Sequence, residues 1–241
     1  MMQDLFNAVL RAYVKVALNV YFNRIRVHGA AHIPKKKAVL LVANHQNALI
    51  DPILLATHTR LNPYFLTRAS VFRKSFVAKI LNFIRMIPVY RVRDGLRNME
   101  KNQESFEKSV EVLRKKGCMI IFGEGNHGTS RSLRPLKKGF VRIAFQALQE
   151  DPELDLVVLP VGINYTNHQA SGSEVGIYFG EAIPAQPYLG KPLQLLRAVE
   201  TALQPLVSQI PEEEHAEITQ ALIKRKVKLS DPKLFAKACL G

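Results

Sequence analysis

The sequence predicts an α/β fold with a mainly parallel or mixed sheet flanked by helices. Apolar runs of strand length recur along the chain, and segments with apolar residues at helical spacing lie between several of them. Continuous apolar runs are typical of strands buried on both faces. With 241 residues, 47% of them hydrophobic, the chain is long enough to bury such a core. We expect an N-terminal amphipathic membrane-interface helix at 1–24, an α/β core at 25–185, and a C-terminal helical segment at 186–241 packed on the core.

The first segment has the pattern of an amphipathic helix with a wide apolar face. Polar residues recur there at helical spacing, and apolar residues fill the rest of the circumference. Such a helix can pack on its own domain or lie in a bilayer interface, and the pattern leaves both open. No run of eighteen uncharged apolar residues occurs, and the start lacks a basic region with a cleavage site, so we expect neither a spanning helix nor a signal peptide. The polar positions are Asp4, Asn7, Arg11, Lys15 and Asn19.

Strands are predicted wherever a short apolar run ends in polar or turn residues. The clearest is AVLLVAN, which follows a short strand and turn in residues 23–37. Pro160 lies inside one of the later runs and indicates an edge strand, a bulge or a strand end there. The strand candidates after residue 37 are 38–44, 63–68, 87–92, 118–124, 155–165 and 174–180.

Helices are predicted between several strands and again at the end of the chain. Residues 72–85 and 96–116 each carry apolar residues on one stripe. Beyond about residue 186 the composition becomes helical, at 193–207 and 212–227. Acidic residues open the last segment and basic residues close it, which matches the helix dipole.

The formal net charge of +14 favours an anionic partner, whether a nucleic acid, a membrane surface or a phosphorylated substrate. Charge alone does not choose among them. The only cysteines are Cys118 and Cys239, and Cys118 lies within an apolar run. This argues against a disulfide framework, and we therefore expect a reducing, cytosolic compartment.

Polar residues directly after a strand are the first place to look for chemistry, because ligands of open α/β sheets bind at the carboxyl ends of strands. The segment NHQNALIDP contains His45 and Asp51. On a regular helix these side chains would point about 120° apart, so a turn must separate them if they pair. Asp51 before Pro52 predicts an N-cap of a helix. A loop ending in that cap could still let His45 give its Nδ1 proton to the carboxylate, leaving Nε2 as a base.

Further candidates follow the other strands. Arg91 and Arg93 alternate along a strand and share a face, where arginine suits bidentate phosphate binding. The loop after 118–122 combines glycines, which let backbone amides approach an anion, with several cations. Each place also has a plain structural reading: surface charges at a strand edge, a solvated loop, a hydrogen-bonded histidine or a helix cap. The candidate substrate-binding residues are Asn44, Arg91, Arg93, Glu124, Gly125, Arg131 and Lys137.

Four segments, in their order and spacing, resemble the blocks of the glycerophospholipid acyltransferase family, which includes glycerol-3-phosphate and lysophosphatidic acid acyltransferases. They are NHQNALID, IPVYR, FGEG and VVLPVGI, and the resemblance spans about residues 25–185. Two features depart from the family pattern. Five residues instead of four separate His45 from Asp51, and Gly123 replaces the usual proline. The longer gap and the segment RPLKKG resemble some fungal glycerol-3-phosphate acyltransferase relatives.

The resemblance implies roles for individual residues. His45 would be the catalytic base and Asp51 its orienting carboxylate, while Arg91 would help to hold the acceptor phosphate. Glu124 and Gly125 take the family's acceptor-binding positions. The implied reaction moves a fatty acyl group from acyl carrier protein or coenzyme A to a hydroxyl of glycerol-3-phosphate or 1-acyl-glycerol-3-phosphate. A different lyso-lipid, such as an aminoacyl lipid, is the alternative acceptor.

We expect direct acyl transfer, since the chain has no G-x-S-x-G elbow and Cys118 lies within a strand, which leaves a covalent acyl-enzyme without an obvious nucleophile. We also expect no cofactor and no metal. The expected partners are the carrier thioester, the glycerol phosphate or lysophospholipid acceptor, and a membrane surface. The amphipathic start and cationic tail predict peripheral attachment at the cytoplasmic face of the cell membrane. A basic nucleic-acid-binding protein is the main non-enzyme alternative, but zinc spacing and RNP-like motifs are missing. A metal hydrolase lacks an HExxH or CxxC frame around its histidines.

Overall fold

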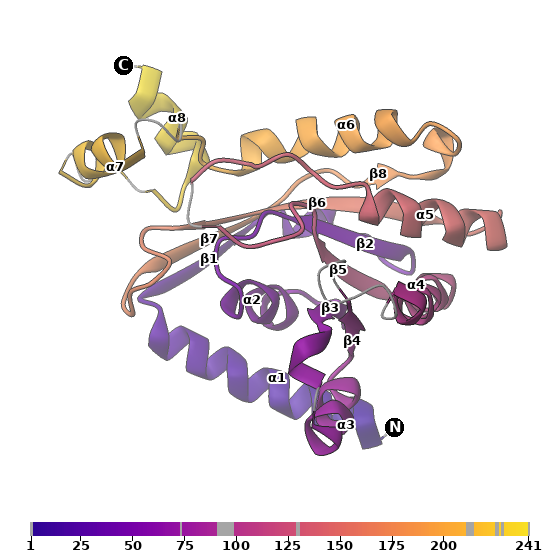
Figure 1. The fold of residues 1–241 in the computed structure, drawn as a ribbon. Helices are drawn as coiled ribbons and strands as arrows, with labels where there is room; N and C mark the ends of the chain where they lie inside the picture. Colours follow the sequence, from indigo (N-terminus) through magenta and orange to yellow (C-terminus); the bar gives the residue numbers. More distant parts are fainter. Residues whose placement is uncertain are drawn as a thin grey trace.

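The computed structural model contains one eight-stranded sheet with helices on both faces (Figure 1). This confirms the predicted α/β fold class. The strand order is β1-β7-β6-β2-β5-β3-β4, and β8 pairs with β6 outside this path. All neighbours are parallel except that β6 runs antiparallel to β7 and β8. The structure describes the chain except residues 1, 73, 91–98, 129–130, 211–214, 225–226, 228 and 241.

The strands agree with the predicted apolar runs to within a few residues. Three of them, β2, β5 and β6, are buried along nearly their whole length because helices cover both faces of the sheet. The C-terminal part of the candidate at 87–92 lies outside the described residues. The strands are β1 (Arg24–His28), β2 (Ala38–Ala43), β3 (Tyr64–Arg68), β4 (Met86–Val89), β5 (Cys118–Phe122), β6 (Leu156–Tyr165), β7 (Glu174–Phe179) and β8 (Ile183–Pro184).

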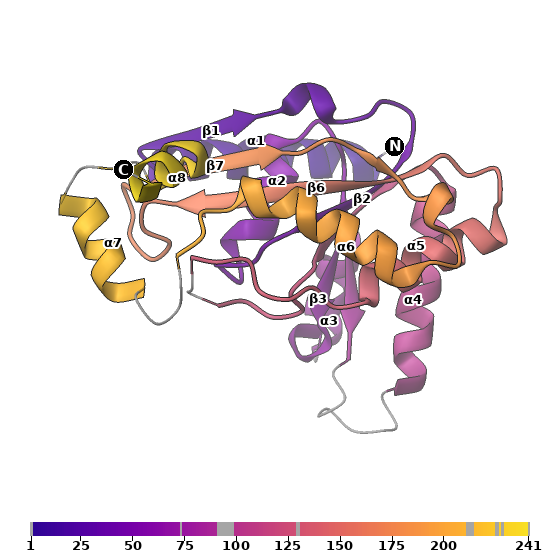
Figure 2. The same ribbon diagram turned by 90° about the horizontal axis from the view of Figure 1, so that it is seen from above.

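The helices form two layers, which Figures 1 and 2 show from two sides. Helices α5 and α6 cross one face of the sheet, with α4 beside them, while α1, α2 and α3 lie on the other. We predicted no helix at the position of α5, although α5 buries an apolar stripe that includes Phe140, Ile143 and Ala147. The helices are α1 (Met2–Tyr21), α2 (Ile50–His58), α3 (Ser75–Phe83), α4 (Met99–Arg114), α5 (Gly139–Glu150), α6 (Pro192–Leu203), α7 (His215–Lys224) and α8 (Pro232–Leu240).

The central strand β2 divides its side chains between two apolar cores. Leu40 and Val42 pack with residues of α4, α5 and α6, whereas Val39 and Leu41 pack with residues of α1 and α2. This alternation follows from the two-residue period of a strand. A third, smaller cluster around Phe235 lies in the C-terminal segment. The carboxyl end of β2 is thereby held from both sides, and the loop that follows it has a rigid base.

Helix α1 has two different faces. Leu18 and Phe22 are buried in the core shared with α2, and the Asn7 side chain donates to the Phe83 carbonyl oxygen at 3.1 Å. The helix therefore packs on its own domain, which was one of the two expected arrangements. Its opposite face is apolar and exposed, and Val20 there is 82% accessible. Within the described part of the chain, no helix combines the length and apolarity needed to cross a membrane.

Candidate active site

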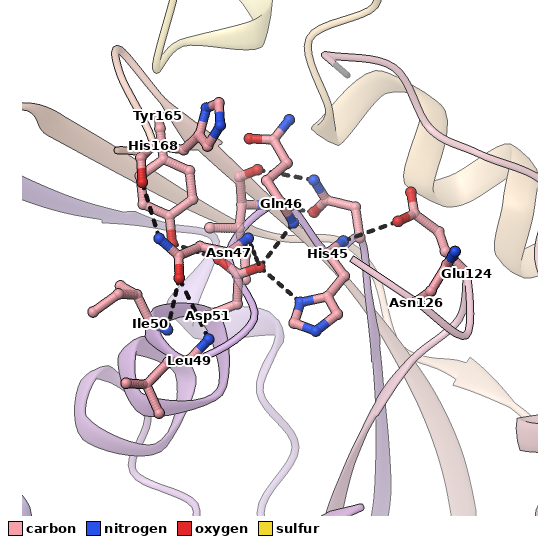
Figure 3. Close-up of polar contacts among 12 residues, drawn as sticks. His45, Gln46, Asn47, Leu49, Ile50, Asp51, Glu124, Asn126, Tyr165 and His168 are labelled. Atoms are coloured by element: carbon pink, nitrogen blue, oxygen red, sulfur yellow. Dashed lines mark hydrogen bonds and ion pairs between the residues drawn. The ribbon is translucent and has the colours of Figure 1, made fainter. Parts of the chain in front are cut away.

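The candidate site lies at the carboxyl end of β2, in the middle of the sheet. His45 follows β2 by two residues, and a short loop leads from it to the start of α2 (Figure 3). The side chain of Asn44 exchanges two hydrogen bonds with the backbone of Ile163 on β6, at 2.9 and 2.7 Å. Because Asn44 is buried and both ends of its amide are engaged, it fixes this loop to the sheet. The expected contact of Asn44 with substrate stays a prediction beside this structural role.

His45 and Asp51 are brought together, as the sequence predicted. The Nδ1 atom of His45 donates to Oδ2 of Asp51 at 2.9 Å (Figure 3). The same oxygen accepts the backbone N–H groups of Gln46 and Asn47, each at 2.8 Å, and the Tyr165 hydroxyl donates to Oδ1. Asp51 is completely buried, and these four donors compensate for the removal of its charge from water.

The predicted capping role of Asp51 is wrong. Helix α2 begins at Ile50, so Asp51 already lies in its first turn, and the N-cap residue is Leu49, which makes no side-chain cap bond. The Oδ1 atom of Asn47 accepts the N–H groups of Leu49 and Ile50 at 3.3 and 3.2 Å, which orders the turn before the helix. The carboxylate of Asp51 points back to the N–H groups of the preceding loop instead of capping the helix.

The imidazole of His45 is held on one face and exposed at one edge. The ring of Phe122, the last residue of β5, stacks on it with 3.8 Å between centroids and 12° between planes. His127 approaches edge-on, with centroids 5.9 Å apart. The His45 side chain is 12% accessible, and among the described residues Nε2 has no hydrogen-bond partner. With Nδ1 donating to a carboxylate, Nε2 is the nitrogen that can accept a proton.

The loop between β5 and α5 is tied to the backbone of His45. The buried carboxylate of Glu124 accepts the His45 N–H at 3.2 Å and the Arg134 N–H at 3.1 Å, and it pairs with the Arg134 guanidinium. Arg134 also donates to the His45 carbonyl oxygen at 3.3 Å, and Gly128 donates to the same oxygen at 3.0 Å. The carboxylate of Glu124 thus accepts donors of the protein itself, and its acceptor-binding role, which the resemblance implied, stays a prediction.

Several other expected site residues have different surroundings. Arg131 is buried and donates to the carbonyl oxygens of Tyr165 and Thr166, and burial lowers the pKa of its guanidinium. This arginine thus secures the end of β6, and its expected contact with substrate stays a prediction. Gly125 has a φ of +77°, a conformation that favours glycine, and Lys137 is exposed beside it. Arg91 and Arg93 lie outside the described residues.

The glycine that departs from the family pattern has a local explanation. A Cβ atom at Gly123 would lie 2.8 Å from Cδ2 of Leu136 and 3.0 Å from Cγ1 of Val42. The Leu136 side chain therefore fills the space that a larger residue would occupy. Leu136 itself belongs to the core under α5, so a larger residue at position 123 would require this side chain to move.

Sequence reasoning missed three residues of the site: Phe122, Arg134 and Tyr165. Each has a signal that becomes readable only with the sheet order. Tyr165 ends β6, and the parallel register that pairs Val161 with Ala43 carries it past the end of β2 to Asp51. Among the described residues, no group of histidine, cysteine or acidic side chains could hold a metal ion.

Several known proteins are similar to this chain in sequence. A family model described as Acyltransferase matches residues 24–164. Glycerol-3-phosphate O-acyltransferase 2 of Saccharomyces cerevisiae is 21% identical, over 70% of this chain and 36% of that protein. The 1-acyl-sn-glycerol-3-phosphate acyltransferase of Borreliella burgdorferi is 29% identical, over 66% of this chain and 59% of that protein. This chain thus spans less than two thirds of the length of either relative.

A solved structure shares the fold. The crystal structure of the 1-acyl-sn-glycerophosphate (LPA) acyltransferase from Thermotoga maritima superposes with a TM-score of 0.65 and 19% sequence identity. The match covers 83% of this chain and 78% of the other. At this identity the likeness shows the arrangement of the sheet and helices.

Proposed function

This chain belongs to the acyltransferase family, whose model matches residues 24–164, and from that premise we propose that it transfers a fatty acyl group to a hydroxyl of a glycerophosphate lipid precursor. The donor is a thioester of acyl carrier protein or coenzyme A. The acceptor is glycerol-3-phosphate or 1-acyl-glycerol-3-phosphate. The observation that carries the proposal is the contact between His45 Nδ1 and Asp51, which leaves Nε2 facing away from the carboxylate.

In this mechanism His45 acts as a general base. Nε2 takes the proton of the acceptor hydroxyl while its oxygen attacks the thioester carbonyl, and Asp51 stabilises the resulting imidazolium. The tetrahedral intermediate then expels the thiolate, which recovers the proton from Nε2 and leaves as the free thiol. Such a base contributes roughly 10²- to 10⁴-fold to the rate. No metal or cofactor takes part in this proposal.

The transfer is direct in this proposal, without an acyl-enzyme on cysteine. Cys118 is buried in β5, and burial raises the pKa of its thiol well above the ordinary value. A thiol that stays protonated and has no access to substrate is a poor nucleophile.

Positioning the acceptor phosphate falls to cationic side chains. Arg91 has this role by resemblance to the family, with Arg93 or Arg131 as a helper, and Lys137 and the Gly125 backbone lie on the loop after β5. Because positioning mainly affects substrate binding, Arg91→Ala should raise the apparent KM for the acceptor more than it lowers kcat. Unchanged acceptor saturation would remove Arg91 from the proposal.

The exposed apolar faces of α1 and α3 support peripheral attachment to a membrane. On α1 the exposed apolar residues follow a spacing of four, four, three and four, which places them in one stripe. On α3 a second stripe is exposed, and the Phe6 and Phe83 rings meet edge-on at 5.2 Å, which joins the two. Exposed lysines beside both stripes suit an anionic leaflet on the cytoplasmic side. The stripes consist of Leu5, Val9, Tyr13, Val16 and Val20 on α1 and of Phe76, Ile80 and Phe83 on α3.

Flotation with anionic liposomes tests this attachment. Deleting α1 would also remove the buried Leu18, so substitutions on the exposed stripe are the better perturbation. We expect Val9→Asp combined with Val16→Asp to abolish flotation while the thermal unfolding midpoint stays within a few degrees. The matched control is Leu193→Asp, an exposed apolar residue on α6 across the sheet, which should float like the wild type. Undiminished flotation of the double variant would contradict the proposal.

An acceptor screen tests the activity itself. Purified protein receives acyl carrier protein and coenzyme A thioesters, each with glycerol-3-phosphate, lysophosphatidic acid, other lysophospholipids or an aminoacyl lyso-lipid, and mass spectrometry identifies the product. We expect an acylated glycerophosphate and a free thiol in equal amounts. Acylation of the aminoacyl lipid alone would shift the proposal to that acceptor. Absence of any ester product from folded protein on liposomes would contradict it.

A further inference from the structure

Tyr165 makes a contact that the mechanism so far does not use. It is the last residue of β6 and is completely buried, and its hydroxyl donates to Oδ1 of Asp51. The two oxygens of Asp51 thus accept from different donors. Oδ2 accepts from the His45 ring and the loop amides, and Oδ1 accepts from the Tyr165 hydroxyl. We propose that Tyr165 is a positioning residue, which sets the orientation and proton affinity of His45 through Asp51. This inference rests on the proposed acyl transfer.

The sheet gives Tyr165 the rigidity that a positioning residue needs. Strand β6 lies beside β2 in parallel register, so the Tyr165 ring and the His45 loop extend from neighbouring strands. The Tyr165 carbonyl oxygen accepts from the buried Arg131, and its ring packs against Phe22 with 6.0 Å between centroids. Tyr165 is therefore fixed through its backbone and through its ring, and this orientation directs its hydroxyl at Asp51.

The hydroxyl stays a donor at every pH at which a histidine titrates. Burial, followed by the negative charge of Asp51, raises the pKa of Tyr165 well above its ordinary value. The donated hydrogen bond takes up part of the negative charge of the carboxylate. Without it Asp51 would attract the Nδ1 proton of His45 more strongly and would favour the imidazolium. His45 would then hold its second proton to higher pH and would be less often available as a base.

In the part of the chain that the structure describes, the Tyr165 hydroxyl has a hydrogen bond to Asp51 and to no other charged group. We expect the other charged groups near the dyad to stay in place when this hydroxyl is removed. From the loop after β5, the ring of His127 and the ion pair of Glu124 with Arg134 face His45. From β6 and α2, Tyr165 and Asp51 face each other. A difference between wild type and a variant that lacks only this hydroxyl thus reports the contact between Tyr165 and Asp51.

The experiment compares Tyr165→Phe with Tyr178→Phe, which removes the hydroxyl of another buried tyrosine in the neighbouring strand β7. The pH dependence of acyl transfer is measured with an acceptor that the wild type uses. In Tyr165→Phe we expect kcat to fall roughly tenfold or more, with KM within about twofold of the wild-type value. The acidic limb of the plot of kcat against pH should move to higher pH by about half to one unit. Tyr178→Phe should follow the wild-type profile.

A second variant keeps the test decisive if Tyr165→Phe does not fold. Incorporation of 3-fluorotyrosine at position 165 keeps the ring and makes the phenol a stronger donor, so the acidic limb should move the opposite way, to lower pH. The inference is overturned if the pH profiles of the variants that fold have the same acidic limb as the wild type. This holds even if kcat is lower, because loss of a purely structural tyrosine would lower kcat without moving the limb.

Failure of the inference can be separated from failure of the proposed function. The protonation midpoint of the His45 ring is followed by NMR without any substrate, in wild type and in both variants. A shift in this midpoint supports the inference whatever the acceptor proves to be. An active wild type with no shift in any variant overturns the inference alone.

Discussion

The clearest separation of chemistry from folding comes from two substitutions at Asp51. In Asp51→Asn the amide oxygen can keep the contacts with His45 Nδ1 and the Gln46 and Asn47 N–H groups, and the amide nitrogen can face a Tyr165 hydroxyl that turns to accept. The geometry survives and the charge is lost. We expect kcat to fall by roughly 10² to 10⁴, with KM nearly unchanged, because the imidazolium is no longer stabilised.

Asp51→Ala removes the acceptor as well as the charge. Two backbone N–H groups then lose their partner in a buried loop, and each such loss costs about 1–3 kcal/mol. The free energy of unfolding should therefore fall by about 2–6 kcal/mol, whereas Asp51→Asn should lose about 1–2 kcal/mol. Urea unfolding at pH 7.5 measures both variants beside the transfer assay. If Asp51→Asn keeps more than a tenth of the wild-type kcat, the charge of Asp51 is not needed and this reasoning fails.

Three further predictions follow from other contacts. Glu124→Gln should lower the free energy of unfolding by about 1–3 kcal/mol and also lower kcat, because Glu124 ties the loop to His45. The control Glu150→Gln breaks a surface pair with Arg114 and should lower the free energy of unfolding by less than about 1 kcal/mol. Equal losses in the two variants would contradict the role of Glu124. Cys118→Ala should retain transfer within about twofold and lose about 1 kcal/mol, and a complete loss of turnover in folded protein would revive a covalent route. Burial lowers the pKa of His58, so between the ordinary value of 6.5 and the lower folded pKa the unfolded chain binds a proton that the folded chain does not. The free energy of unfolding should therefore decrease as the pH falls through this range. Urea titrations at pH 7.5 and 5.5 should show a smaller decrease in His58→Gln than in the wild type, and an equal decrease would refute this.

The parts of the fold that depend on local pattern could be predicted from the sequence. The continuous run in β2 indicated a strand covered on both faces, and the angular argument about His45 and Asp51 required the turn that the structure contains. The resemblance to acyltransferases, which the family comparison supports, rested on segments that follow a strand, as NHQNALID follows β2, or that contain strand residues, as IPVYR and VVLPVGI do. These inferences succeed because short apolar runs and helix geometry are properties of neighbouring residues.

What the sequence could not show is which of several similar side chains turns inward. Arg131, Arg134 and Lys137 lie in one cationic loop, yet one supports β6, one holds Glu124 and one is exposed. The placement of Arg131 depends on the end of β6, 34 residues away, and that of Arg134 depends on Glu124 and the His45 carbonyl oxygen, 10 and 89 residues away. The same applies to Tyr165, whose partner Asp51 is 114 residues distant and is reached only through the parallel pairing of β6 with β2.

The assignment of the cap failed for a related reason. Both Asn47 and Asp51 are good N-cap residues, and the proline after Asp51 favoured the second. The competing demand came from His45 and the loop amides, which need a carboxylate inside the turn. The local N-cap preference was therefore overridden, because the buried Asp51 carboxylate accepts hydrogen bonds from His45 and the loop amides instead.

The central claim is that His45 removes the proton of the acceptor alcohol. The most direct measurement is single-turnover transfer from a radiolabelled acyl thioester by His45→Ala, with the same acceptor and liposomes as the wild type and with folding verified by circular dichroism. We predict a folded protein whose rate of ester formation falls by at least roughly 10²-fold. Ester formation by the folded variant at a rate within tenfold of the wild type would contradict the claim.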